Sequence, residues 1–367
     1  MDVAVVTTSE GLADLRAEWE QLESHASTPY YVTHRFVTAW WKSFGQLPDY
    51  RLHVVTIRQD GRLVGIGPFA LRPGRRHRRA VSVLGWASHG DYLSLLYSGG
   101  DASAKSKTIT SLVMAELTRL IDDGEVALVD LRGIPSESSF AWDVRKSQQY
   151  HRHLAFHIEN PYLDLSQGYT VPSNARKCRS KLHRERDVSL AVFHGDQHGI
   201  YARIAAVHGA EKEHLIAQGR DERHSLFENP QRFKHIQTIF RDTDDALTFA
   251  LVEGGDPRSG RVVGYFTVFR HAGRLLSWNS AYLPEYEDYR IGTVVQLEIL
   301  EYLEEHDPGH ELGHEFDLGA GKYPWKFEWT PSLRATYRVL MKAPATPWMA
   351  WAEATARRVR RLYDATG

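Results

Sequence analysis

The alternation of apolar and polar positions along the chain predicts one series of elements twice. In the first half, residues 52–58 and 63–71 alternate as two strands joined by an Asp-Gly dipeptide, which is typical of a tight hairpin turn. In the second half, residues 247–252 and 262–269 form a corresponding pair. A further strand, an amphipathic helix and a short buried strand follow each hairpin. The pattern therefore predicts a mixed α/β fold.

Two short sequence matches accompany this shared order. Leu63-Val64-Gly65 in the first hairpin corresponds to Val262-Val263-Gly264 in the second. Val129-Asp130-Leu131, after the first long helix, corresponds to Phe316-Asp317-Leu318 after the second. Matches of three residues arise easily by chance, so the prediction rests mainly on the order of the elements. We predict two copies of one α/β unit rather than one large domain.

The segment from residue 282 to 329 has the most unusual composition. Tyrosines precede Arg290-Ile291-Gly292 and a predicted helix, and Gly319 and Gly321 follow a buried strand. Lys326 then lies within a cluster of aromatic residues. An arginine and a glycine at a helix start suit a phosphate group, because the unpaired N–H groups there carry positive potential. Neither GxGxxG nor GxxxxGK is present, so a glycine entry to a core helix is an equally good interpretation.

Composition narrows the class of protein. The 367 residues are 42% hydrophobic and 25% charged, as in ordinary globular proteins, and a net charge of −1 favours neither nucleic acid nor membrane. The single cysteine, Cys178, excludes an internal disulfide, and the 19 histidines show no HExxH pattern, so we predict no metal. No long apolar run or leader peptide is evident. We expect a cytoplasmic protein without stable membrane insertion.

Three charged stretches allow more than one interpretation. The basic run at 176–186 suits phosphate contacts, in nucleic acid or in a smaller ligand, but also suits a solvated helix between domains. His208, Glu211 and His214 have the spacing of one helical face, which suits acid–base chemistry or an ordinary surface helix. The basic segment at 348–363 fits a packed terminal helix better than a membrane-surface helix.

The sequence shows no signature of a covalent nucleophile, since GxSxG is absent and Cys178 has no evident partner. A direct transfer reaction is the better fit. Such a reaction needs a base for an acceptor amine, a donor that polarises an acyl carbonyl, and a holder for the leaving group.

The segment at 282–329 resembles the signature of the cellulose-biosynthesis-associated acetyltransferase family, within the GNAT superfamily of acyl-CoA N-acyltransferases. The resemblance covers Arg290-Ile291-Gly292, the run from Phe316 to Gly321, and Trp325-Lys326, and it extends more weakly over most of the chain. Trp325 stands where the family has tyrosine, and Leu318 where it has phenylalanine. If the family tyrosine contributes its hydroxyl to the reaction, Trp325 does not supply one.

The resemblance implies tandem GNAT-like folds, each a mixed, mostly antiparallel sheet flanked by helices. It implies an N-terminal domain at 1–165 that forms the acceptor wall with a degenerate donor site, a donor-binding catalytic domain at 166–345, and a basic helix at 346–367. It also implies acyl-CoA as the donor. The related Fem-type transferases take aminoacyl-tRNA instead, and a non-catalytic binding protein on the same fold is a third possibility.

We therefore predict an acyl-CoA-dependent N-acyltransferase that acts in the cleft between two domains. The acceptor amine is an amino sugar, an envelope precursor, a lipid amine or a secondary metabolite. The predicted site residues fall into three groups by role. They are His208, Asp317 and Lys326 for catalysis; Arg290, Gly292 and Thr293 for the donor; and Asp91, Tyr92, Tyr282 and Trp325 for the acceptor.

Overall fold

The computed structural model describes residues 1–24, 29–76, 79–98, 105–220, 226–307, 309 and 311–343, and the helix expected at 346–367 lies outside them. Two series of elements follow one another. The first comprises β1 (Asp2–Val6), α1 (Ser9–Asp14), α2 (Arg16–Ser24), η1 (Tyr30–Val32), α3 (His34–Phe44), β2 (Arg51–Gln59), β3 (Arg62–Arg76), β4 (Arg79–Trp86), β5 (Leu96–Tyr97), α4 (Ser106–Asp122), β6 (Leu128–Pro135), α5 (Ser139–Lys146), η2 (His151–His153) and β7 (Leu154–Asp164). The second comprises η3 (Leu165–Gln167), α6 (Ala175–Glu185), β8 (Val188–His194), η4 (Gln197–Gly199), α7 (Ile200–Ala217), α8 (Pro230–Asp242), β9 (Ala246–Glu253), β10 (Arg261–His271), β11 (Arg274–Tyr282), η5 (Pro284–Tyr289), α9 (Ile291–His306), β12 (Glu315–Asp317), α10 (Pro324–Phe327) and β13 (Leu333–Lys342).

The predicted repeat is confirmed in the topology. The run β2-β3-β4-α4-β6 and the run β9-β10-β11-α9-β12 each form a hairpin, a strand, a helix and a strand that pairs in parallel with the one before the helix. The two matched glycines lie beneath the crossing helices. A Cβ on Gly65 would lie 2.5 Å from Ile109 of α4, and one on Gly264 would lie 3.1 Å from Ile291 of α9. Close packing of helix on sheet therefore explains why both copies have glycine there.

Turn residues and side-chain alternation account for the hairpins. Asp60 and Gly61 have φ values of 52° and 76°, and two left-handed residues in succession suit the twist of a two-residue hairpin turn. In β10 every residue from Val262 to Phe269 is buried, because helices cover both faces of the sheet there.

A 13-stranded mixed sheet runs through both series in the order β1-β2-β3-β4-β6-β13-β7-β12-β11-β10-β9-β8, with β5 paired to β3 at one side. The strand β13 comes late in the chain but lies between β6 and β7, antiparallel to both. The strand β7 in turn pairs with β12. The two halves are thus joined by a continuous ladder of backbone hydrogen bonds, and the domain limits at 165 and 345 stay a prediction.

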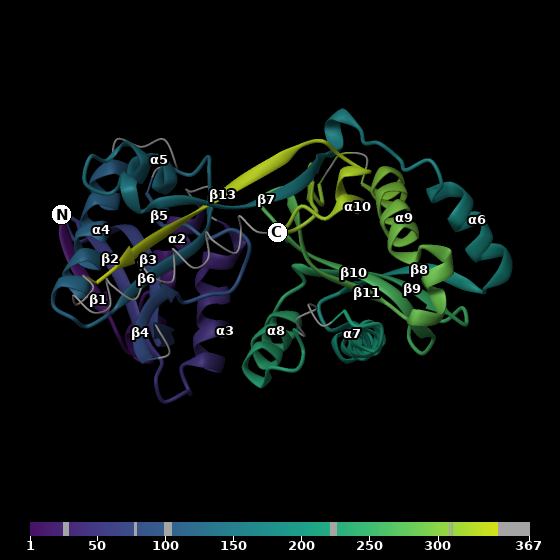
Figure 1. Cartoon of the computed structure of the whole chain (residues 1–367), viewed down its shortest axis with the longest axis horizontal. Helices are drawn as coiled ribbons and strands as arrows, with labels where there is room; N and C mark the ends of the chain where they lie inside the picture. The colour runs from purple at the N-terminus through teal and green to yellow at the C-terminus, as the bar shows by residue number, and fades with distance from the viewer. Residues whose placement is uncertain are drawn as a thin grey trace, which may run out of the picture.

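Helices cover both faces of the second half and meet the first half along one side. Figure 1 shows α6, α9 and α10 above the strands β8 to β11, with α7 and α8 below them. The helix α8 packs against α3 of the first half. The candidate site is built around β13, β7, β12 and β11, which are neighbours in that order in the sheet.

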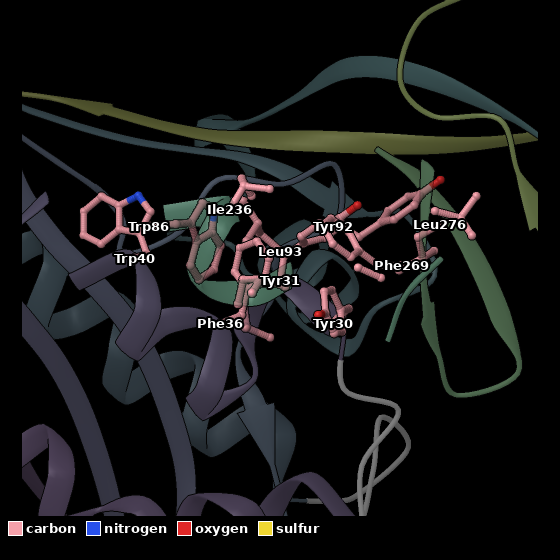
Figure 2. Close-up of a cluster of buried hydrophobic side chains, with 14 of the residues drawn as sticks. Tyr30, Tyr31, Phe36, Trp40, Trp86, Tyr92, Leu93, Ile236, Phe269 and Leu276 are labelled. Atoms are coloured by element: carbon pink, nitrogen blue, oxygen red, sulfur yellow. The ribbon is translucent and has the colours of Figure 1, made fainter. Parts of the chain in front are cut away.

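An apolar cluster fixes the two halves against each other beside this site. The ring of Tyr30 stacks on Phe269 at 5.0 Å between centroids, and Phe36 lies edge-on to His235 at 4.7 Å. Figure 2 shows the cluster, which draws on both halves; its labelled members are Tyr30, Tyr31, Phe36, Trp40, Trp86, Tyr92, Leu93, Ile236, Phe269 and Leu276. Burying each such side chain contributes about 1.5–3 kcal/mol, so the halves hold a defined relative position.

Candidate active site

Asp317 ends the short buried strand β12 and is 1% exposed. Its carboxylate accepts hydrogen bonds from the Tyr92 hydroxyl and, at 2.7 Å, from the backbone N–H of Gly319. Gly319 has φ of 78°, a left-handed conformation that turns the chain back toward the carboxylate. Burial raises the pKa of Asp317 to about 7, with Asp91 contributing in the same direction. This carboxyl group is therefore poised to exchange a proton near neutral pH.

Lys326 lies in the one-turn helix α10 and is 3% exposed. Its Nζ donates to the carbonyl oxygens of Gly319 at 2.7 Å and Ala320 at 2.9 Å. The rings of Tyr323 and Trp325 lie 5.3 Å and 5.7 Å from the same nitrogen. Burial lowers the pKa of Lys326 to about 8, although nearby carboxylates oppose the fall. The ammonium thus holds the glycine turn in place and also titrates close to neutral pH.

The first half contributes two residues to this network from the loop after β4. The Tyr92 hydroxyl donates to Asp317, and the Asp91 carboxylate accepts from the backbone N–H of Ala320 at 3.0 Å. A Cβ on Gly133 would lie 2.9 Å from the carbonyl oxygen of Asp91, so glycine at that position permits the loop to approach β6. Asp91 is half-buried, whereas Asp317 is enclosed, and burial raises the pKa of Asp91 as well. The structure therefore brings four predicted site residues from two halves together.

Sequence analysis missed the cation that completes the network. Arg334, at the start of β13, makes a two-pronged ion pair with Glu315 at 2.7 and 2.8 Å and contacts Glu137 at 2.7 Å. Its guanidinium reaches Asp317 only at 3.5 Å. One signal was available in the sequence: Glu315 and Asp317 stand two apart in an otherwise apolar strand, so both face one side and need a buried partner.

The start of α9 forms the second part of the site. Arg290 has φ of 50° and precedes the helix without a side-chain cap, and the N–H groups of Thr293 and Val294 bond back to its carbonyl oxygen. Gly292 is exposed, and a Cβ there would meet nothing within 4 Å. Arg290 pairs with Glu328 at 3.4 Å, and both line a cavity of about 540 Å³ beside residues 170–174. An exposed helix start beside an arginine suits an anion, and the donor-binding role of Arg290, Gly292 and Thr293 stays a prediction.

The strand β11 connects the two parts. The parallel pairing of β11 with β12 ends at Leu276 opposite Asp317, where the Ser277 hydroxyl donates to the Asp317 carbonyl. Beyond it, β11 continues to Tyr282 with β10 along its other edge. The pairing with β12 covers residues 274–276, whereas the pairing with β10 extends to Tyr282. Tyr282 is half-buried at the end of β11, and the chain then leads through η5 to α9.

His208 lies apart from these groups. It is 2% exposed in α7, and its ring packs at 5.1 Å from that of Phe227. Figure 1 shows α7 below the strands of the second half, whereas α9 and α10 lie above them. The role of His208 as a base stays a prediction.

Most of the basic run at 176–186 has partners. Arg179 pairs with Glu301 and Arg184 with Glu185, while Lys181 and Arg186 lie 4.9 Å and 5.2 Å from the ring centres of Tyr289 and Tyr286. Arg176 and Lys177 are exposed one helical turn from the cavity at α9.

Two further features bear on the class of site. Within the described residues, every helix is too short or too polar to span a bilayer. The same residues contain no group of three or more His, Cys, Asp or Glu side chains arranged to hold a metal ion.

Comparison with known proteins gives the second half a family likeness. Residues 172–327 match a family model described as an acetyltransferase (GNAT) domain. A search of curated proteins finds no match.

Solved structures share the fold over nearly the whole chain. FemX aligns with a TM-score of 0.52 at 9% identity, over 93% of this chain and 98% of its own. The C-terminal domain of a putative lysylphosphatidylglycerol synthetase from Agrobacterium fabrum aligns at 0.50 and 12%, over 94% and 96%. A tandem GNAT protein from the clavulanic acid biosynthesis pathway aligns at 0.48 and 14%, over 94% and 100%. The internal repeat and the domain match together make this chain a tandem arrangement of GNAT-like folds.

Proposed function

We propose that this chain is an N-acyltransferase that moves an acyl group from acyl-CoA to an amine in the cleft between its two halves. One observation carries the proposal. The segment that matches the GNAT domain contains both the glycine-containing start of α9 and the buried network around Asp317, and β11 lies beside β12 and leads through η5 to α9. A carrier arm bound between these two parts would have its phosphates at the helix start and its thioester beside the titratable network.

The donor end of the site consists of Arg290, Gly292 and Thr293. The absence of a side chain at Gly292 leaves room for a pyrophosphate to approach the positive end of the helix, and Arg290 adds a charged donor. The 540 Å³ cavity beside residues 170–174 offers room for the rest of the nucleotide. Glu328 pairs with Arg290 at 3.4 Å, and a bound phosphate would take the place of Glu328.

The reacting end consists of Asp91, Tyr92, Asp317 and Lys326. Asp91 is the half-buried carboxylate of the network, and we assign it to an N–H group of the neutral acceptor amine. The lone pair of the neutral amine nitrogen attacks the thioester carbonyl, the C–N bond forms, and the C–S bond breaks. Asp317 takes the amine proton through the Tyr92 hydroxyl, and the Lys326 ammonium supplies a proton to the departing thiolate. Tyr282 and Trp325, both half-buried, flank the acceptor.

The acceptor is an amine of a sugar, an envelope precursor, a lipid or a secondary metabolite. In this proposal residues 1–165 form the acceptor wall and residues 166–345 hold the donor. The loop bearing Asp91 and Tyr92 is then the part of the first half that selects the acceptor.

Isothermal titration of the purified chain with CoA and acetyl-CoA tests the donor. We expect saturable binding, weakened at least tenfold by Arg290→Ala, which removes one charged contact of about 1.5–3 kcal/mol. Arg258→Ala, at an exposed arginine in the turn between β9 and β10, serves as the matched control. Absence of heat at millimolar CoA would reject acyl-CoA as the donor.

A second candidate donor is an aminoacyl-tRNA, supported by exposed Arg176 and Lys177 beside the cavity at α9. It predicts RNA in the purified protein and affinity that falls steeply with salt. Reversing both charges to glutamate would then abolish transfer while leaving the fold intact. Mass spectrometry of released acyl species and an RNA assay on the same sample separate the two donors.

A further inference from the structure

Arg334 serves three carboxylates at once, and they compete for it. A guanidinium has five N–H donors in a fixed fork. Its Nε faces Glu137 at 2.7 Å, and its two terminal nitrogens face the two oxygens of Glu315 at 2.8 and 2.7 Å. Only one terminal nitrogen also reaches Asp317, at 3.5 Å, which is too long for a strong hydrogen bond. Glu315 therefore occupies the terminal N–H groups of Arg334 that would otherwise be available to Asp317.

The surroundings hold Arg334 in this arrangement. Its side chain is 9% exposed, and its guanidinium lies 4.7 Å from the ring centre of Tyr162 and 5.5 Å from that of Tyr92. Contact with the two rings restricts the plane of the fork. Glu315 is equally buried, so its carboxylate is stabilised by protein partners rather than by water. The pair is thus a rigid element beside Asp317.

We propose that Glu315 is a positioning residue: by holding Arg334, it keeps that arginine from forming a full ion pair with Asp317 and so leaves Asp317 able to accept a proton. Its consequence for catalysis rests on the proposed function, but its effect on Asp317 does not. The same chain contains the opposite arrangement at Asp130, which accepts from Arg338 at 2.6 Å and from Arg132 at 3.1 Å. With Glu315 neutralised, Asp317 would approach that state.

The other charged and titratable groups around Asp317 remain in place when Glu315 changes. They are Asp91 and Tyr92 from the loop after β4, Tyr31 from η1, Tyr162 from β7, Lys326 from α10 and Arg334 from β13. A change at Glu315 therefore acts on Asp317 through Arg334 and through the loss of the Glu315 charge itself, and it also removes the partner of Arg274, which lies 3.5 Å from Glu315.

The test follows the side-chain carboxyl carbon of Asp317 by NMR titration in protein labelled at aspartate, with Asp317→Asn assigning the signal. Glu315→Gln keeps size and removes charge. We expect the titration midpoint of Asp317 to fall by about one pH unit or more, the usual effect of a close opposite charge. The acid limb of the pH–rate profile for acyl transfer should shift to lower pH by the same amount. Glu315→Asp, which keeps the charge, should leave the midpoint within a few tenths of the wild-type value.

Glu137→Gln is the matched control, because it removes an ion pair of equal length on the far side of the fork. We expect it to move the midpoint less than Glu315→Gln does. The double variant Glu315→Gln/Arg334→Gln leaves no buried charge unpaired within this pair, so it remains testable if the single variant fails to fold. In the double variant the midpoint should return to the wild-type value or above it. An unchanged midpoint in folded Glu315→Gln, or a fall in the double variant, overturns the proposal. An inactive protein with the expected midpoint shift contradicts only the acyltransferase function.

Discussion

The two aspartates at the same place in the repeat have opposite environments. Asp130 lies in β6, and Asp317 in β12, each in a short buried strand after the crossing helix. Burial alone would raise the pKa of Asp130, but hydrogen bonds from Arg338 and Arg132 outweigh it and hold the pKa below its ordinary value. Asp317 has one distant arginine, and burial raises its pKa to about 7. The two copies thus differ in how closely arginines approach the aspartate. Asp130 is held in ion pairs with two arginines, whereas Asp317 has no close ion pair and is able to take a proton.

The largest expected effect is on activity. Asp317→Asn removes the proton acceptor and should lower the transfer rate by about 10²–10⁴-fold, the usual contribution of a general base. Asp130→Asn, at the matched position, should leave the rate of the folded protein within a few fold. Steady-state rates of both variants with acetyl-CoA and an accepted amine measure the contrast. Equal losses in both would mean that the two halves do not differ in the way described.

A second contrast concerns stability against pH. Because the pKa of folded Asp317 lies above that of the unfolded chain, near 3.9, the folded state binds more protons between about pH 4 and 7. The ionised carboxylate therefore destabilises the fold as pH rises through this window, and Asp317→Asn should gain stability over wild type at pH 8.

The contribution of Asp130 to stability changes with pH in the opposite direction. Its folded pKa is lowered, so its contribution is present above the unfolded value and is lost as pH falls through the folded one. Asp130→Asn should therefore lose stability at pH 8, by about 1–3 kcal/mol. Urea unfolding of both variants at pH 5 and pH 8 gives the comparison. A loss of stability in Asp317→Asn at pH 8 would contradict the assigned pKa.

The smallest effect distinguishes the two crossing helices. The second residue of α9 is Gly292, and the second of α4 is Lys107, both exposed. Gly292→Ala should stabilise the helix by at most about 1 kcal/mol, since the added Cβ meets nothing. It should nonetheless weaken CoA binding about tenfold, or 1.4 kcal/mol, by covering the helix start. Lys107→Ala should leave CoA affinity unchanged in the same titration, and a loss there would place the donor in the first half.

Local patterns predicted the repeat but not how the two halves join. Hairpins, helices and the strands with Asp130 and Asp317 follow from alternation and spacing within about 70 residues. The position of β13 between β6 and β7 does not, because strand pairing across the chain leaves no local pattern.

The site also has a part that the sequence predicted and a part that it did not. Asp91, Tyr92, Asp317 and Lys326 were predicted from composition and resemblance, and they meet. Arg334 was missed because its partners stand far from it in sequence, and Glu137 lies in the other half. His208 was chosen mainly for its ordinary pKa and for its spacing with Glu211 and His214, and neither signal reveals that its ring packs against Phe227.

The placement of β13 has a consequence for how the protein is made. Its ladder with β6 pairs Asp130 with Leu340, so a ribosome must synthesise almost the whole described chain before the first sheet is complete. Until then β6 and β7 expose unpaired edges, which favour association with other chains. Contacts this distant in sequence also slow folding. We expect the nascent first half to depend on chaperones, and a fragment ending near residue 165 to aggregate unless a peptide spanning residues 333–342 is supplied with it.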